Sequence, residues 1–201
     1  MAIAVKTVVV AEESQVFHRK WVSIYIHSLS VFNIMKLYKQ LEFLGILPDK
    51  NTLVVDCGCG DGRVLIDFYN NGYNVFGIDK DEDKIKEVKN LMLNGNFVCG
   101  DIRNVDLPTG FIIFRNVLQF LDSKDEVNNI ITKNLNSSMY ISLFGKEDEL
   151  KNKALTWTRD EVEKLMQDIG KITRFTETKG KGKNLKNEDR FSHTYEILRM
   201  I

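Results

Sequence analysis

Cysteine and proline are scarce in this chain, with three cysteines and two prolines among 201 residues. Cys57, Cys59 and Cys99 are too few for a disulfide framework and fit a reducing compartment. They also fall short of the four ligands that a structural zinc ion takes. We therefore expect small packed or exposed thiols and no metal site.

Net charge and long apolar runs are also lacking. Lysine and arginine number 28, as do aspartate and glutamate, so no overall field draws the protein to nucleic acid or anionic membranes. No stretch approaches the roughly 20 apolar residues of a membrane-spanning helix. The apolar start, Met1–Val10, is short, and acids follow it at once, which is atypical of a signal peptide. These features predict a soluble, cytoplasmic protein.

Hydrophobic residues make up 43% of the chain, enough for one domain over residues 1–201. The apolar pattern from Phe17 to Leu44 is helical, in two pieces. Because this segment precedes the first predicted strand, we expect residues 1–50 to form a helical cap over the ligand site. Residues 51–201 are expected to form an α/β core.

Apolar runs and helical patterns alternate through the core. This order predicts a Rossmann-like, doubly wound sheet of seven strands, mostly parallel. Capping boxes at Ser123–Glu126 and Thr158–Glu161 mark the starts of two of its helices. No helix separates the last two strands, so they should pair antiparallel. The predicted strands span 53–56, 74–79, 96–100, 111–114, 139–144, 172–178 and 193–200.

The first core strand runs into a glycine-rich turn, Asp56-Cys-Gly-Cys-Gly-Asp-Gly62, and a helical pattern follows. A strand, tight loop and helix in this order lay a ligand across the carboxyl edge of an α/β sheet. Glycines let backbone N–H groups approach the ligand, and the helix presents its positive end.

Acids end three successive strands: Asp56, Asp79 and Asp101. Asp79 lies about 20 residues beyond the glycine turn, where a carboxylate accepts both hydroxyls of a ribose. Asp101 is placed to accept from an exocyclic amine such as that of adenine. The three acids therefore indicate a nucleoside ligand.

Glycine spacing separates two kinds of nucleoside ligand. A dinucleotide site has the pattern G-x-G-x-x-G, whereas this turn has Gly58-x-Gly60-x-Gly62, with Asp61 inside it. A carboxylate there repels a pyrophosphate but can hold a cationic amine. The turn thus favours a nucleoside that ends in an amino acid, and it argues against a nicotinamide-dependent oxidoreductase.

Four segments, 54–63, 75–79, 100–102 and 114–121, resemble the motifs of class I S-adenosylmethionine-dependent methyltransferases in order and spacing. The resemblance implies that S-adenosylmethionine is the cofactor and S-adenosylhomocysteine the product. It implies that Asp56–Gly62 surround the methionine part and that Asp79 binds the ribose. Adenine would lie beside Lys80, Asp101 and Ile102, and the sulfonium above Arg115-Asn116-Val117. The implied cofactor-binding set is Asp56, Cys57, Gly58, Cys59, Gly60, Gly62, Asp79, Lys80, Asp101, Ile102, Arg115, Asn116 and Val117.

Gln119 stands where many relatives carry histidine, so a histidine base at that position is excluded. Methyl transfer can proceed without a base, because an in-line approach of a positioned nucleophile lowers much of the barrier. Whether this chain uses a general base stays open.

Of the implied reaction, the sequence determines the methyl acceptor least. Residues 144–149 and 158–161, with Arg190–His193, are similar to segments of small methyltransferases associated with tellurite resistance and with thiol or metalloid methylation. A small-molecule acceptor is therefore predicted, although the acids at 147–149 also read as a solvated charge run. The candidate acceptor-site residues are Trp21, Tyr25, His27, Glu147, Asp148 and His193.

Two other functions stay open. Lys179, Lys181, Lys183 and Lys186 stand among glycines in a predicted hairpin loop and could reach phosphates. This favours, as an alternative, an RNA, DNA or protein methyltransferase. No aromatic residue interleaves them to stack on bases. The second alternative is a non-catalytic cofactor-binding subunit of a methyltransferase complex.

Overall fold

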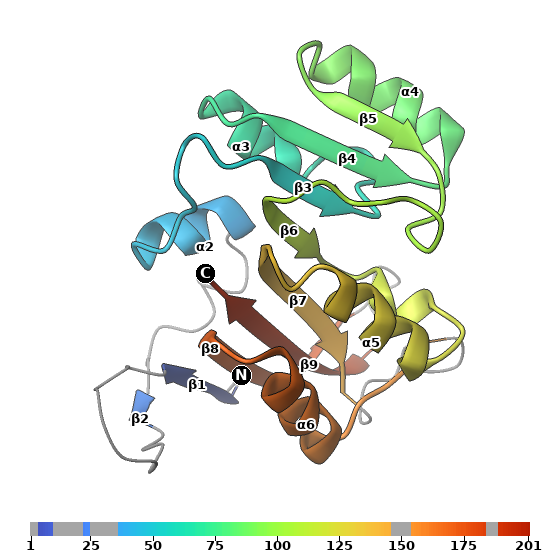
Figure 1. Cartoon of the computed structure of the whole chain (residues 1–201). Helices are drawn as coiled ribbons and strands as arrows, with labels where there is room; N and C mark the ends of the chain where they lie inside the picture. Colours follow the sequence, from blue (N-terminus) through green and yellow to red (C-terminus); the bar gives the residue numbers. More distant parts are fainter. Residues whose placement is uncertain (1–3, 10–21, 25–35, 146–153, 184–188) are drawn as a thin grey trace.

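A computed structural model describes residues 4–9, 22–24, 36–145, 154–183 and 189–201 (Figure 1). The strands are β1 (Ala4–Val9), β2 (Val22–Ile24), β3 (Val54–Cys57), β4 (Val75–Asp79), β5 (Asn96–Cys99), β6 (Phe111–Phe114), β7 (Ser138–Phe144), β8 (Ile172–Lys183) and β9 (Asp189–Arg199). The helices are α2 (Leu37–Phe43), α3 (Leu65–Asn70), α4 (Glu82–Leu91), the 3-10 turn η1 (Leu118–Phe120), α5 (Lys124–Lys133) and α6 (Arg159–Ile169).

All nine described strands belong to one sheet, in the order β2-β1-β8-β9-β7-β6-β3-β4-β5. Strands β3 to β7 pair in parallel, and β9 pairs antiparallel with both β7 and β8. The seven predicted strands and the antiparallel C-terminal hairpin are therefore confirmed. Because β3, β4 and β6 are adjacent and parallel, the loops that follow them meet at one edge of the sheet.

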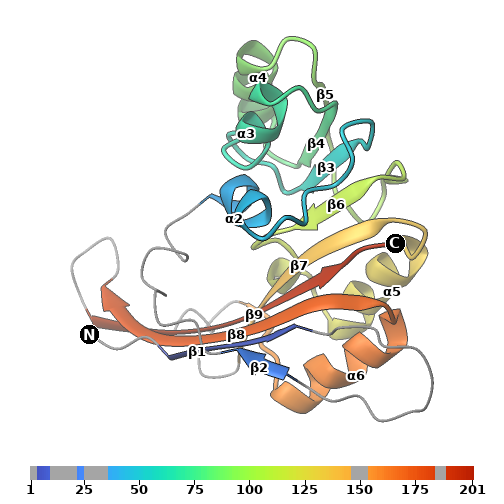
Figure 2. The ribbon, with the colours of Figure 1, turned by 90° about the vertical axis from the view of Figure 1, so that its left-hand side faces the viewer.

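Helices cover both faces of the sheet (Figure 2). On one face α2, α3 and α4 enclose an apolar core that contains Phe68, Val88 and Phe111. On the other, α5 and α6 enclose a second core around Phe114, Ile141 and other buried residues. The central strands β3, β6 and β7 are buried along their whole length, as parallel strands covered on both faces should be.

Side-chain caps start α5 and α6 where the sequence indicates. Thr158 accepts from the backbone N–H of Glu161, and the Glu161 carboxylate accepts from that of Thr158, which completes the predicted capping box. At α5, Ser123 accepts from the N–H of Glu126, but the Glu126 carboxylate accepts from Asp122 instead. That second box is therefore only half formed.

The predicted helical cap over residues 1–50 is wrong where the structure describes it. Residues 4–9 and 22–24 form β1 and β2, which extend the sheet beyond β8. The only helix described in this segment is α2, whose buried side chains pack on the face that α3 also covers. Figure 1 shows α2 beside the starting end of β3, opposite the glycine turn. At residues 22–24, backbone pairing with the edge of β1 thus outweighs the helical spacing of the apolar residues.

The C-terminal hairpin is longer than predicted. The strands pair from Ile172 with Arg199 to Lys183 with Asp189, so Lys179–Lys183 continue β8 where the sequence suggested a loop. Backbone pairing with β9 across the hairpin holds these glycines and lysines in an extended strand conformation. Among the described residues, no helix is long and apolar enough to cross a membrane.

Candidate functional site at the carboxyl edge of the sheet

The turn after β3 is held against the ends of two neighbouring strands. The N–H groups of Gly58 and Cys59 both donate to the Ile78 carbonyl of β4, at 2.7 and 3.0 Å. On the other side, a Cβ on Gly58 would lie 2.8 Å from Val117, which follows β6. Only glycine allows this approach, and Gly58 also has φ +73°. The loops after β3, β4 and β6 therefore meet, as predicted.

Asp79 lies at the centre of this meeting point. Its Oδ2 accepts from the N–H of Gly60 at 2.8 Å, and its Oδ1 accepts from that of Asp81 at 2.9 Å. These bonds fix the carboxylate at the end of β4 beside the glycine turn. Each carboxylate oxygen keeps further acceptor capacity, so the group can also take two hydroxyl donors from a sugar.

Asp56 is buried beneath the turn, with 2% of its surface exposed. Burial is the main cause that raises the pKa of its carboxyl to about 8, with Arg115 opposing the shift and Asp79 adding to it. A carboxyl that ionises near neutral pH gains from a cation placed beside it, because the cation favours the charged form. Asp56 is thus the acid of this site that a cationic ligand affects most.

Asp61 is already paired inside the turn. Arg63 donates to its carboxylate from Nε at 2.9 Å and from a second guanidinium nitrogen, and these bonds lower the pKa of Asp61 to about 2. Both side chains are partly or largely exposed, so the pair is weak and a ligand ammonium can compete for it. The carboxylate that we predicted to hold an amine therefore has an internal cation as its partner.

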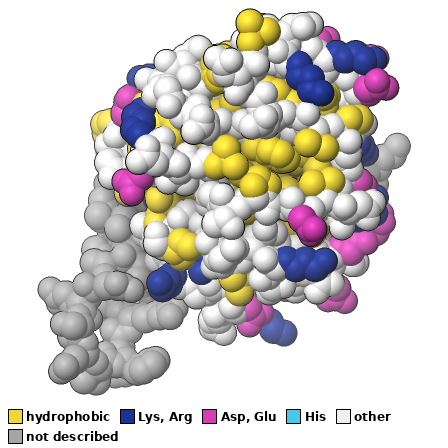
Figure 3. Space-filling view, turned by 45° about the horizontal axis from the view of Figure 1, so that its top comes forward, with side chains coloured by type: hydrophobic (Ala, Val, Ile, Leu, Met, Phe, Trp, Pro, Cys, Tyr) yellow, Lys and Arg dark blue, Asp and Glu magenta, His cyan; other side chains and the backbone are white. Residues whose placement is uncertain are grey.

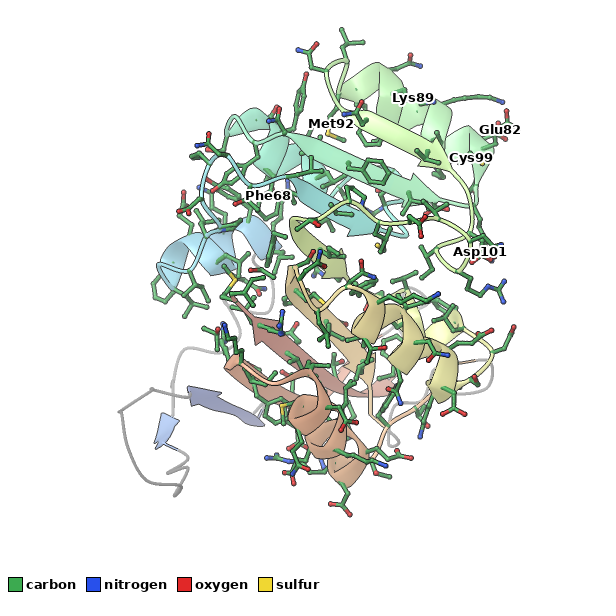
Figure 4. The ribbon with its side chains drawn as sticks, in the orientation of Figure 1. Phe68, Glu82, Lys89, Met92, Cys99 and Asp101 are labelled. Atoms are coloured by element: carbon green, nitrogen blue, oxygen red, sulfur yellow. The ribbon has the colours of Figure 1, made fainter. Side chains whose placement is uncertain are left out.

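Asp101 follows β5 at the same edge and is likewise engaged by a neighbour (Figure 4). Arg103 donates to it from Nε at 2.9 Å and from Nη2 at 2.6 Å, which lowers its pKa to about 2. Arg103 also reaches Asp122 at 2.9 Å. Ile102 is buried in the core under α5, whereas Lys80 is exposed. The sequence reasoning missed Arg103, although its place two residues after the acid was a visible signal.

The turn after β6 completes the site. Asn116 has φ +56°, a left-handed conformation that asparagine adopts more readily than most residues. Its Oδ1 accepts from the Ser142 hydroxyl of β7 at 3.3 Å. Ser142 was also missed, and its signal was a hydroxyl within an apolar strand. Arg115 precedes Asn116 and acts electrostatically on Asp56, so this turn faces the glycine turn.

Gln119 is fully buried in η1, and among the described residues neither its amide nitrogen nor its amide oxygen has a hydrogen-bond partner. Its backbone carbonyl accepts from the N–H of Leu155, which ties η1 to the segment before α6. An amide cannot take a proton near neutral pH, so no base stands at this position. A buried amide without a hydrogen bond lowers the free energy of unfolding. Glutamine is therefore an unfavourable residue at this apolar position.

Two of the three cysteines pack in the core, and the third lies at the surface. Cys57 and Cys59 are buried free thiols whose pKa burial raises, and Cys99 is exposed. Cys59 lies under β4, where a Cβ on Gly77 would come within 2.8 Å of its sulfur. Within the described part of the chain, no group of histidine, cysteine or acidic residues could hold a metal ion.

His193 lies on β9, on the α6 side of the sheet. It is 3% exposed, and its Nε2 is 3.0 Å from Oε1 of Glu177, which also accepts from Arg159 at 2.7 Å. A Cβ on Gly145 would meet the imidazole at 2.2 Å, so this ring lies against the end of β7. His193 therefore stands where the chain leaves β7 toward residues 147 and 148. The candidates Trp21, Tyr25, His27, Glu147 and Asp148 lie outside the described residues.

A methyltransferase-domain family model matches residues 54–135. The chain is also similar to an uncharacterized protein of Methanocaldococcus jannaschii, with 36% identity over 76 residues, 35% of each chain. The matched part thus spans about a third of that relative.

Three solved structures share the fold at low sequence identity. The magnesium protoporphyrin IX methyltransferase of Synechocystis, with bound S-adenosylmethionine, has a TM-score of 0.57 and 21% identity over 85% of this chain and 77% of that one. A TehB-like S-adenosylmethionine-dependent methyltransferase of Corynebacterium glutamicum has a TM-score of 0.52 and 15% identity, over 82% and 90%. The 1,6-didemethyltoxoflavin-N1-methyltransferase of Burkholderia thailandensis, with its substrate and S-adenosylhomocysteine, has a TM-score of 0.55 and 15% identity, over 80% and 75%. Residues 54–135 thus match a methyltransferase-domain family, and the chain has the fold of these S-adenosylmethionine-dependent methyltransferases.

Proposed function

We propose that the protein transfers a methyl group from S-adenosylmethionine to a small-molecule acceptor. The observation that carries this proposal is the meeting of the glycine turn with Asp79, whose carboxylate is fixed 2.8 Å from the N–H of Gly60. Two structural neighbours act on small molecules, a porphyrin and a toxoflavin precursor, which supports the acceptor class.

The residues at the edge of the sheet fit that cofactor. Asp79 would bind the ribose hydroxyls, and the turn Asp56–Gly62 would surround the methionine part, whose ammonium Asp56 and Asp61 would attract. Lys80, Asp101 and Ile102 would border the adenine. Arg115, Asn116 and Val117 would pass beneath the sulfonium. The open conformations of Gly58, Gly60 and Gly62, all with positive φ, leave the backbone of the turn accessible to the ligand.

The bound cofactor supplies an activated methyl group with a good leaving group. What remains for the chain is to hold the acceptor nucleophile in line and to exclude water. Asn116 and Ser142, which are hydrogen-bonded to each other, would lie beside the sulfonium and orient the nucleophile. No base is provided by Gln119, so a proton on the nucleophile would leave to water or to another group near the acceptor.

Binding and turnover test this proposal directly. We expect calorimetry to show binding of S-adenosylmethionine and S-adenosylhomocysteine, and Asp79→Asn to weaken it about tenfold or more by removing a charged acceptor. Asp83→Asn, an exposed carboxylate on α4, serves as the matched control and should bind like the parent. If neither S-adenosylmethionine nor S-adenosylhomocysteine binds while NADH does, the proposal is wrong.

The acceptor class needs a separate screen with tritiated methyl groups over small thiols, metalloid oxyanions, RNA and protein extracts. Labelling of a small molecule would support the proposal, and labelling confined to RNA or protein would replace it with the macromolecular alternative. Cofactor binding with no labelling by the isolated chain would favour the non-catalytic subunit. Figure 3 shows lysines, arginines and acids interspersed around an apolar patch on one face, with no continuous basic surface there.

A further inference from the structure

Asp101, the acid that follows β5, is bound by three N–H groups of a single residue. The backbone N–H of Arg103 and its Nε both donate to Oδ1, each at 2.9 Å, and its Nη2 donates to Oδ2 at 2.6 Å. The guanidinium thus binds the carboxylate through two parallel hydrogen bonds, a geometry that fixes the relative orientation of the two groups. The proposed function uses Asp101 but gives Arg103 no part.

Arg103 is itself fixed from its other side. Its Nη1 donates to Asp122 at 2.9 Å and lies 4.0 Å from the carboxylate of Glu126, in the first turn of α5. That carboxylate also accepts from the backbone N–H of Asp122, at 3.0 Å. Isolated ion pairs at the surface stabilise little, but a bidentate arginine within a network of several charges is an exception. Arg103 therefore joins the loop after β5 to the start of α5.

This network leaves Asp101 with little spare capacity to accept hydrogen bonds. A carboxylate oxygen accepts about two of them. Among the described residues, Oδ1 of Asp101 has two donors and Oδ2 has one, so the position that stays open is on Oδ2. The side chain is 29% exposed, which leaves it within reach of a ligand. One open position on one oriented oxygen suits a single N–H donor.

We propose that Arg103 is a positioning residue that holds this open position of Asp101 toward the amino group of adenine, and that it thereby makes the protein select a 6-aminopurine cofactor. The physical reason is preorganisation, because a carboxylate that is already oriented loses less freedom when the ligand binds. Without the guanidinium, the same carboxylate can turn toward solvent. The inference rests on the proposed function, since it needs adenine to lie beside Asp101.

Two ligands measure this selectivity by calorimetry: S-adenosylhomocysteine and its 6-deamino analogue, in which hydrogen replaces the amino group of adenine. The ratio of their dissociation constants reports on the amino group, because both ligands have the same ribose and amino-acid parts. We expect the parent protein to bind S-adenosylhomocysteine at least about tenfold more tightly, as for one hydrogen bond to a charged acceptor. Arg103→Gln should lower this ratio to about threefold or less, by weakening the binding of S-adenosylhomocysteine and not that of the analogue.

Further variants separate positioning from charge and from general damage to the site. Arg103→Lys keeps the charge but cannot form the two parallel bonds, so its ratio should fall as far as that of Arg103→Gln. Asp101→Asn should also lower the ratio, and adding Arg103→Gln to it should change the ratio no further, because the arginine acts through that carboxylate. Arg63→Gln is the matched control. Arg63 likewise binds the acid two residues before it, Asp61, but in the glycine turn, so the parent ratio should persist.

The outcomes separate this inference from the proposed function. If the parent prefers S-adenosylhomocysteine and either Arg103→Gln or Arg103→Lys keeps that preference, the positioning role is wrong and the methyltransferase proposal stands. An equal fall of the ratio in Arg63→Gln, a further fall in the double variant, or equal binding of both ligands by the parent would also refute the role. If the parent does not bind S-adenosylhomocysteine, the proposed function fails and this inference fails with it.

Discussion

Single residues decide the electrostatics of the site, and Asp56 is the clearest case. Burial raises its pKa to about 8, from an ordinary value near 3.8. Between these two pH values the folded protein holds a proton on Asp56 that the unfolded chain has lost. The contribution of Asp56 to the free energy of unfolding is therefore greatest at low pH. It falls as the pH rises toward 8, by up to about 1.4 kcal/mol per pH unit.

Replacing Asp56 with asparagine tests this pH dependence. Asparagine has the shape of the neutral acid and does not titrate, so Asp56→Asn should gain stability relative to the parent as pH rises from about 5 to about 8. Urea unfolding of both proteins across that range measures the difference. The exposed Asp106→Asn is the control and should show no such trend. A difference between Asp56→Asn and the parent that stays constant with pH would contradict the raised pKa.

At the scale of elements, the glycine turn and α4 depend on each other through Gly62. A Cβ there would lie 2.5 Å from Val88 and 2.6 Å from Met92, both on the buried side of α4 and its C-terminal cap. The residue also has φ +76°, a backbone conformation that side chains rarely adopt. The turn can therefore lie over α4 only because this position has no side chain.

Two alanine substitutions separate packing from backbone strain. Gly62→Ala and Gly72→Ala both place a side chain at positive φ, but a Cβ on Gly72 meets nothing within 4 Å. Gly62→Ala should therefore lower the free energy of unfolding by about 1–3 kcal/mol more than Gly72→Ala. It should also weaken cofactor binding. Equal losses of stability in denaturant titrations would show that α4 accommodates the methyl group.

At the scale of the whole molecule, Arg199 joins the end of β9 to distant parts of the chain. Its guanidinium donates to the carbonyls of Ile169, Ser137 and Leu135, at 3.0, 2.6 and 2.8 Å. The first ends α6, and the other two lie between α5 and β7. One side chain thus fastens the C-terminal strand to the layer that covers it.

Lysine cannot replace that three-way contact, because its ammonium is a single compact donor group. Arg199→Lys should lower the free energy of unfolding by roughly 2–4 kcal/mol, since at least one buried carbonyl loses its partner. Arg159→Lys, at a half-exposed position on α6, should cost less. Thermal unfolding followed by circular dichroism measures both, and a smaller loss for Arg199→Lys would refute this role.

The sequence by itself determined the parallel core, the capping of α6 and the convergence of Asp56, Asp79 and the glycine turn. These follow from local signals: apolar runs, capping residues and acids at strand ends. Only the tertiary structure decided that residues 4–9 and 22–24 extend the sheet, because strand pairing depends on an open edge far along the chain. It also decided that Arg63 and Arg103 pair with the acids Asp61 and Asp101, and that the Ser142 hydroxyl donates to Asn116. Ser142 and Asn116 are 26 residues apart in the chain, and the pairing of β6 with β7 brings them together.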